Sequence, residues 1–180
     1  IEIQDGDEVI MPSHTYCATA LAFARRGAII KWADIDPNSL TVTLNSIEKL
    51  ISKKTKAIVV VHLYGLICKE IFEIKDFASE NNYYLIEDCA QSLGAKLNGK
   101  HCGTIGDIGC YSFHSQKNLT TLGEGGMITV KDEKLAKKVL GLRINGHSQF
   151  ENKTKYWLPA MVNVDLDIDS VWPIKSTMNE

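Results

Sequence analysis

Four side chains in the middle of the chain have the chemistry needed to hold an aromatic aldehyde. They are Asp88, Gln91, Ser112 and Lys117. A lysine amine can form a Schiff base with an aldehyde, a buried carboxylate can keep a pyridine nitrogen protonated, and a hydroxyl near a glycine-rich turn can hold a phosphate. Taken alone, each of these residue types is usually solvated surface. Their order and their setting in the chain therefore decide the interpretation.

The segments around these residues alternate between strand and helix patterns. Asp88 directly follows an apolar run at 83–87, and Lys117 follows a second run at 108–113 and precedes a Gly-Glu-Gly-Gly turn. A third run at 56–61, rich in β-branched residues, is followed by an amphipathic helical pattern. This alternation predicts a parallel sheet, in which ligands bind at the carboxyl ends of the strands. Asp88 falls at such an end.

The remaining predicted elements extend this pattern in both directions. Ser13 stands where an N-cap belongs, ahead of a helix that Gly27 would end. From Gln149 onward the helical period is lost, although 163–168 partly alternates. The other elements are strands at 8–11, 28–35 and 127–130 and helices at 44–52 and 132–142.

The composition favours a globular protein with a buried core and gives no support for binding to nucleic acid or membranes. With 180 residues, of which 44% are hydrophobic, the chain can bury a sizeable core. Its formal net charge of −2 gives no electrostatic support for nucleic acid or an anionic membrane as a partner. No apolar stretch approaches the roughly 20 residues of a membrane span, and no signal peptide pattern is present, so a cytoplasmic location is expected. The five cysteines and five histidines lack metal-ligand spacing, and no metal site is predicted.

Four segments resemble one known family in sequence and in order. They are PSHTYCAT, VVHLYG, IEDCAQSLGA and GDIGCYSFHSQKNLTTLGEGGMI, and the likeness covers most of residues 5–147. They resemble the DegT/DnrJ/EryC1/StrS sugar aminotransferases, which use pyridoxal phosphate on the fold type I scaffold. The resemblance implies an α/β, three-layer large domain with a mostly parallel central sheet at 1–148, truncated at both ends. Residues 149–180 would connect it to a missing C-terminal small domain.

The resemblance also assigns roles to single residues. Lys117 matches the lysine of the family's SFxxxK pattern, which binds the cofactor aldehyde and then moves a proton. Asp88 would pair with the pyridinium nitrogen, and Gln91 would lie near the phenolic oxygen. Ser112 would bind the phosphate, and Tyr16 would stack on the ring. An arbitrary lysine is more often a surface residue and an arbitrary tyrosine more often part of a core, so these interpretations stay open for Lys117 and Tyr16.

The implied activity is transfer of an amino group, from glutamate, onto a nucleotide-linked keto-deoxysugar by a homodimer in amino-sugar biosynthesis. Two alternatives remain. A subgroup of the family, the sugar dehydratases, has histidine in place of the Schiff-base lysine, so Lys117 favours transamination. A non-catalytic regulatory or binding protein could keep the same scaffold, but the presence of both Lys117 and Asp88 favours an enzyme.

Overall fold

The computed structural model describes residues 1–143 of the chain. Its contacts divide the chain into two units, at residues 1–131 and 132–180, and each is considered by itself. The first unit holds a mixed sheet, a small hairpin and helices α1 to α3. The described part of the second unit is Asp132 and the helix α4 (Glu133–Arg143) that follows it. The predicted connecting segment at 149–180 lies outside the described residues.

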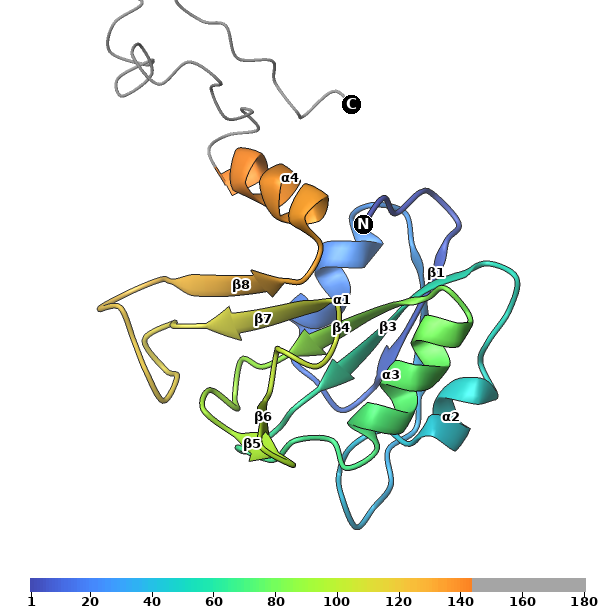
Figure 1. The fold of residues 1–180 in the computed structure, drawn as a ribbon, viewed down its shortest axis with the longest axis horizontal. Coiled ribbons are helices and arrows are strands. Elements are labelled where there is room, and N and C mark those ends of the chain that lie inside the picture. The colour runs from blue at the N-terminus through green and yellow to red at the C-terminus, as the bar shows by residue number, and fades with distance from the viewer. Residues whose placement is uncertain (144–180) are drawn as a thin grey trace, which may run out of the picture. The chain divides into compact units, whose positions relative to one another are not determined.

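Six strands form one mostly parallel sheet (Figure 1). Their spatial order is β2-β1-β3-β4-β7-β8, and each neighbouring pair is parallel except β7 and β8. The predicted α/β class with a mostly parallel sheet is thus confirmed. The strands are β1 (Glu8–Pro12), β2 (Ile29–Ala33), β3 (Thr55–Val61), β4 (Tyr84–Asp88), β7 (Ile108–Ser112) and β8 (Gly126–Val130).

Helices cover both faces of this sheet (Figure 1). Helices α2 (Leu44–Glu48) and α3 (Ile71–Glu80) pack on one face, where Ile74 is fully buried. Helix α1 (Cys17–Ala24) packs on the opposite face through Phe23. None of the helices within residues 1–143 has the length and apolar character that a bilayer span requires.

Strand β3 shows why the predicted strand segments consist of continuous apolar residues and do not alternate between apolar and polar residues. Its side chains point alternately to the two faces, and both faces are covered. Ile58 and Val60 belong to the core under α2 and α3, whereas Val59 and Val61 belong to the core under α1. After β1 the chain goes to β2 on one side and then returns to β3 on the other. Such a reversal opens a crevice at the carboxyl ends of the strands.

The start of α1 differs from the sequence expectation. Ser13 does not cap the helix, because the chain bends over residues 13–15 and the helix begins only after Tyr16, which is extended (φ −79°, ψ 146°). Tyr16 is the N-cap residue and makes no side-chain capping hydrogen bond. A cap that was not predicted lies at α2, where the Thr43 hydroxyl accepts from the Ser46 N–H and Ser46 Oγ accepts from the Thr43 N–H.

A short hairpin was also missed. It consists of β5 (Lys96–Leu97) and β6 (Lys100–His101), which pair antiparallel. Two-residue strands are too short to show a period of two. The sequence of the turn could have predicted the hairpin, because Asn-Gly is the dipeptide that best tolerates a two-residue turn with positive φ values. The structure has such a turn, with φ values of 50° at Asn98 and 77° at Gly99.

Candidate active site

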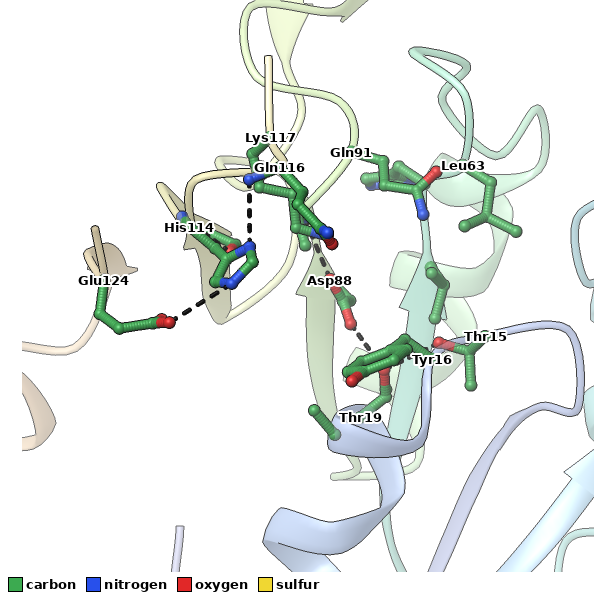
Figure 2. Close-up of a pocket in the computed structure, with 15 residues that line it drawn as sticks. Thr15, Tyr16, Thr19, Leu63, Asp88, Gln91, His114, Gln116, Lys117 and Glu124 are labelled. Atoms are coloured by element: carbon green, nitrogen blue, oxygen red, sulfur yellow. Dashed lines mark hydrogen bonds and ion pairs between the residues drawn. The ribbon is translucent and has the colours of Figure 1, made fainter. Parts of the chain in front are cut away.

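A cavity of about 550 Å³ opens at the carboxyl ends of β1, β3, β4 and β7 (Figure 2). Its volume lies in the range that small-molecule sites occupy. All five residues predicted to hold the cofactor line it: Tyr16, Asp88, Gln91, Ser112 and Lys117. The fold thus brings side chains from separate segments of the sequence to one edge of the sheet.

Asp88 ends β4 on the face that α1 covers. Strand alternation places Asp88 on the side of Ile86, whereas Glu87 points to the opposite core. Asp88 Oδ2 accepts a hydrogen bond from Thr19 Oγ1 at 2.8 Å. Its Oδ1 accepts one from the backbone N–H of Ala90 at 3.0 Å. Both carboxylate oxygens are therefore held in place at the cavity wall.

Lys117 lies in the loop that follows β7 and is half-buried. Its backbone N–H donates to the carbonyl oxygen of His114 at 2.9 Å. The His114 ring bridges this loop, since Nδ1 accepts from the Gln116 N–H at 3.1 Å and Nε2 lies 3.3 Å from Glu124 Oε1 (Figure 2). Ser112, the last residue of β7, accepts through Oγ from the His114 N–H at 3.4 Å. These contacts fix the turn that carries Lys117 on the cavity wall.

Tyr16 and Gln91 come from the loops after β1 and β4. Tyr16 is 71% exposed, so the interpretation of this residue as a core aromatic is wrong. Gln91 Oε1 accepts from the Tyr64 N–H at 3.3 Å, which orients the amide. Tyr64 has φ 56°, a left-handed backbone that is uncommon for a non-glycine residue.

A second cavity of about 350 Å³ is lined by Tyr64 and shares Gln91, Gln116 and Lys117 with the first.

A second acid, Glu87, is buried on the other face of β4. Its Oε1 accepts from the N–H groups of Ile105 and Gly106 at 2.7 and 2.5 Å. Its Oε2 accepts from the Gly103 N–H at 2.7 Å and from His62 Nε2 at 2.9 Å. Burial raises the pKa of Glu87, but the hydrogen bonds from His62, Gly106 and Gly103 outweigh it and leave the pKa below its usual value. Glu87 is thus a charged core residue that anchors the loop before β7.

The buried His62 links the backbone at Cys68 to Glu87. Its Nδ1 accepts from the Cys68 N–H at 3.2 Å, so the ring proton sits on Nε2 and is donated to Glu87. His62, Glu87 and Cys89 lie close enough together to be considered as metal ligands. Both ring nitrogens of His62 and both carboxylate oxygens of Glu87 already have hydrogen-bond partners. The burial of these polar atoms is therefore explained by protein hydrogen bonds, and no metal ion is needed to explain it.

Further cavity residues were not predicted, among them Thr15, Thr19, His114 and Glu124. Thr15 precedes α1 and Thr19 lies in its first turn, and their hydroxyl oxygens are 2.8 Å apart. No local pattern in the sequence indicated that Asp88 would lie beside them. His114 and Glu124 pair across a loop, and such a pairing has no signature in the sequence.

The sequence has extensive matches among known proteins. The model of the DegT/DnrJ/EryC1/StrS aminotransferase family matches residues 1–168. The chain is 44% identical over 149 residues to the UDP-N-acetyl-3-dehydro-α-D-glucosamine 3-aminotransferase of Acidithiobacillus ferrooxidans, covering 83% of this chain and 40% of that protein. It is 41% identical over 144 residues to the GDP-perosamine synthase of Vibrio cholerae, covering 80% of this chain and 39% of that protein. The chain therefore spans less than half the length of these relatives.

Solved structures agree with the sequence matches. An aminotransferase from Psychrobacter cryohalolentis superposes with a TM-score of 0.78 and 41% identity, over 81% of this chain and 37% of that one. The GDP-4-keto-6-deoxy-D-mannose-3-dehydratase of Escherichia coli, solved with bound hydrated pyridoxal phosphate, superposes with a TM-score of 0.73 and 32% identity, over 79% and 36%. The family model, the sequence identities and the shared fold together place the chain in the DegT/DnrJ/EryC1/StrS aminotransferase family.

Proposed function

We propose that this chain is part of a pyridoxal-phosphate-dependent aminotransferase that moves an amino group onto a keto group of a nucleotide-linked sugar. One observation carries the proposal. An amine, a carboxylate, a hydroxyl and an aromatic ring converge on a single cavity, from Lys117, Asp88, Ser112 and Tyr16. Each of these groups suits a different part of the same cofactor.

The chemistry of the donor set fits pyridoxal phosphate. Lys117 offers the primary amine that the aldehyde requires. Asp88 offers a carboxylate, already hydrogen-bonded on both oxygens, to a protonated ring nitrogen. Ser112 offers its hydroxyl to the phosphate, and the exposed ring of Tyr16 offers a flat apolar surface to a planar ligand.

When bound, pyridoxal phosphate supplies an electron sink for the negative charge left on a carbon that loses its proton. The protein residues then have separate tasks. Lys117 would hold and return that proton at Nζ, since it is the amine that lines both the main and the second cavity. Gln91 has its Oε1 engaged by the Tyr64 N–H, which leaves Nε2 to donate to the phenolic oxygen.

A nucleotide-linked sugar is the substrate that the relatives support. The two relatives described above carry a UDP-linked amino sugar and a GDP-linked perosamine in their names. Apart from Lys117, the second cavity is lined by neutral hydrogen-bonding groups, from Tyr64, Gln91, Gln116 and Asn118. Amides and a phenol match sugar hydroxyls better than they match an apolar substrate. We assign glutamate as the amino donor and amino-sugar biosynthesis as the process.

The proposal includes a homodimer in the cytoplasm. Leu21 on α1 and Trp32 on β2 are 52% and 49% exposed. Strand alternation puts Trp32 on the same face of β2 as Ile30, which packs in the core under α1. Large apolar side chains gathered on one side are the kind of surface that a second copy covers. All five cysteines, which lie within the described residues, are free thiols, as expected in a reducing compartment. Sedimentation checks the assembly, and a stable monomer with full activity would contradict it.

The two alternatives are less well supported. A sugar dehydratase of this family would have histidine at position 117, where this chain has lysine. A regulatory protein without catalysis would have no need of an amine and a carboxylate in one cavity, yet Lys117 and Asp88 both line it.

An absorption spectrum tests the proposal. The product of the complete gene, incubated with pyridoxal phosphate, is expected to develop a visible band that borohydride removes. Lys117→Ala should abolish this band, whereas Lys100→Ala, at an exposed lysine of the hairpin outside the cavity, should keep it. A wild-type protein without the band, or a Lys117→Ala variant that retains it, would contradict the assignment. Activity with glutamate against a panel of nucleotide-linked keto-sugars then identifies the substrate.

A further inference from the structure

Three side chains at the cavity wall form a chain of hydrogen bonds that ends on Asp88. Thr15 Oγ1 and Thr19 Oγ1 lie 2.8 Å apart, and Thr19 Oγ1 donates to Asp88 Oδ2 at 2.8 Å (Figure 2). All three residues line the cavity. Thr19 and Asp88 are 69 positions apart in the sequence, so the contact joins α1 directly to the end of β4.

The direction of this chain follows from counting protons. A threonine hydroxyl has one proton to donate. Thr19 gives its proton to Asp88, so in its contact with Thr15 it can only accept. Thr15 is therefore the donor to Thr19. The chain of donation runs from Thr15 to Thr19 and then to the carboxylate, and the hydroxyl of Thr19 has no other orientation that keeps both bonds.

Thr19 controls the rotation of the Asp88 carboxylate. The terminal torsion of an aspartate side chain is broad and roughly two-fold, so by itself it fixes the carboxylate plane poorly. The backbone N–H of Ala90 holds Oδ1, and among the described residues the hydroxyl of Thr19 is the donor that holds Oδ2. With one donor removed, the carboxylate can turn about the remaining bond.

The local structure of α1 sets Thr19 beside the predicted stacking residue. Tyr16 is the N-cap of α1, and the Thr19 N–H donates to the Tyr16 carbonyl oxygen at 3.1 Å. Residues three apart in a first helical turn share a face. Both side chains consequently line the cavity, and the ring of Tyr16 and the hydroxyl that orients Asp88 are held by the same turn.

We propose that Thr19 is a positioning residue for the cofactor: its hydroxyl orients the Asp88 carboxylate toward the ring nitrogen of pyridoxal phosphate. This inference depends on the proposed function. It adds a residue that touches neither the reacting carbon nor the aldehyde and acts through Asp88 alone. Charge-assisted hydrogen bonds of this kind are the stronger ones in proteins, so the loss of orientation should be measurable as weaker binding.

The test uses two ligands and compares their dissociation constants by fluorescence titration. One is pyridoxal phosphate, and the other is the analogue in which a carbon atom replaces the ring nitrogen. Thr19→Val keeps the shape of the side chain and removes the hydroxyl. It should weaken binding of pyridoxal phosphate about tenfold, the effect of losing one such hydrogen bond, and binding of the carbon analogue less than about twofold.

Control variants separate positioning from folding. Thr19→Ser retains a hydroxyl and should restore binding of pyridoxal phosphate to within about threefold of wild type. Thr104→Val removes a hydroxyl that donates to the His101 carbonyl oxygen outside the cavity, and should leave both dissociation constants unchanged. If Thr19→Val does not fold, Thr19→Ala replaces it, since alanine sets no extra methyl group against the carboxylate.

Each outcome bears on the inference. A loss with pyridoxal phosphate that disappears with the carbon analogue supports it. Equal losses with both ligands, or no loss with either, overturn it and leave Thr19 as a structural link between α1 and β4. A wild-type protein that binds neither ligand and shows no borohydride-sensitive band overturns the proposed function itself, and this inference with it.

Discussion

Glu87→Gln is expected to destabilise the fold by about 2–4 kcal/mol while changing side-chain volume very little. Glu87 accepts two hydrogen bonds on each oxygen, from Ile105 and Gly106 on one and from Gly103 and His62 on the other. A glutamine replaces one of these oxygens with an NH₂ group that cannot accept. Two of the four bonds are therefore lost in either orientation of the amide.

The magnitude follows from opposing terms. Hydrogen bonds to charged groups contribute about 1.5–3 kcal/mol each, so the two lost bonds amount to about 3–6 kcal/mol. Removal of a buried charge offsets part of this loss, because the carboxylate of Glu87 no longer has to be desolvated on folding. The remainder is a large share of the roughly 5–15 kcal/mol that stabilise a typical domain.

Denaturant unfolding followed by circular dichroism measures the change. Glu80→Gln, at the exposed end of α3, is the matched control and should stay within about 0.5 kcal/mol of wild type. Hydrogen exchange at the amides of Gly103, Ile105 and Gly106 should accelerate in Glu87→Gln only. A loss below about 1 kcal/mol with unchanged exchange would refute the view that Glu87 anchors this loop by its charge.

Three further measurements follow from the site and the core. Asp88→Asn should lower turnover on the order of a hundredfold and cofactor content much less, because a neutral amide cannot stabilise a protonated ring nitrogen; equal turnover would leave Asp88 as a strand-end cap. Folding lowers the pKa of Glu87 from its usual value of 4.5. The ionised Glu87 carboxylate therefore stabilises the folded state above pH 4.5, and this contribution to the free energy of unfolding declines as the pH falls below 4.5. Denaturation midpoints should therefore drop more steeply with acid in wild type than in Glu87→Gln, and parallel curves would contradict this. Iodoacetamide at mildly alkaline pH should label the exposed Cys17 before Cys110, since burial raises the pKa of the Cys110 thiol to about 11; peptide mass mapping checks the order, and faster labelling of Cys110 would contradict it.

The strands could be predicted because the signals that mark them lie within the strand segments themselves and the residues next to them. A run such as the one at β3 is apolar throughout since both faces are covered, and a turn or helix pattern marks each end. The residues of the main cavity were predictable only through motifs. Asp88 ends β4 and Lys117 lies in the loop after β7, in the expected order, and the fold then places both on one cavity.

The parts that sequence reasoning missed depend on contacts between distant segments. Ser13 has the residue type of a helix cap, but the chain bends over residues 13–15 and the helix begins only after Tyr16, which lines the cavity. Nothing near Thr19 in the sequence indicates that its hydroxyl meets Asp88. The partner of Glu87 is likewise a distant histidine, His62, and the other donors to Glu87 are backbone groups that no residue type reveals.

The two adjacent acids at the end of β4 have a consequence for folding fidelity. Glu87 meets four hydrogen-bond donors inside the core, and Asp88 meets a hydroxyl and an amide at the cavity. A slip of one residue in the pairing of β4 with β3 or β7 would turn every side chain to the opposite face. The shorter aspartate would then enter the buried site, out of reach of some donors, and the apolar residues Leu85 and Ile86 would exchange cores. A misregistered strand would thus hold a buried charge with too few hydrogen-bond donors, which favours its return to the register that places Asp88 at the cavity.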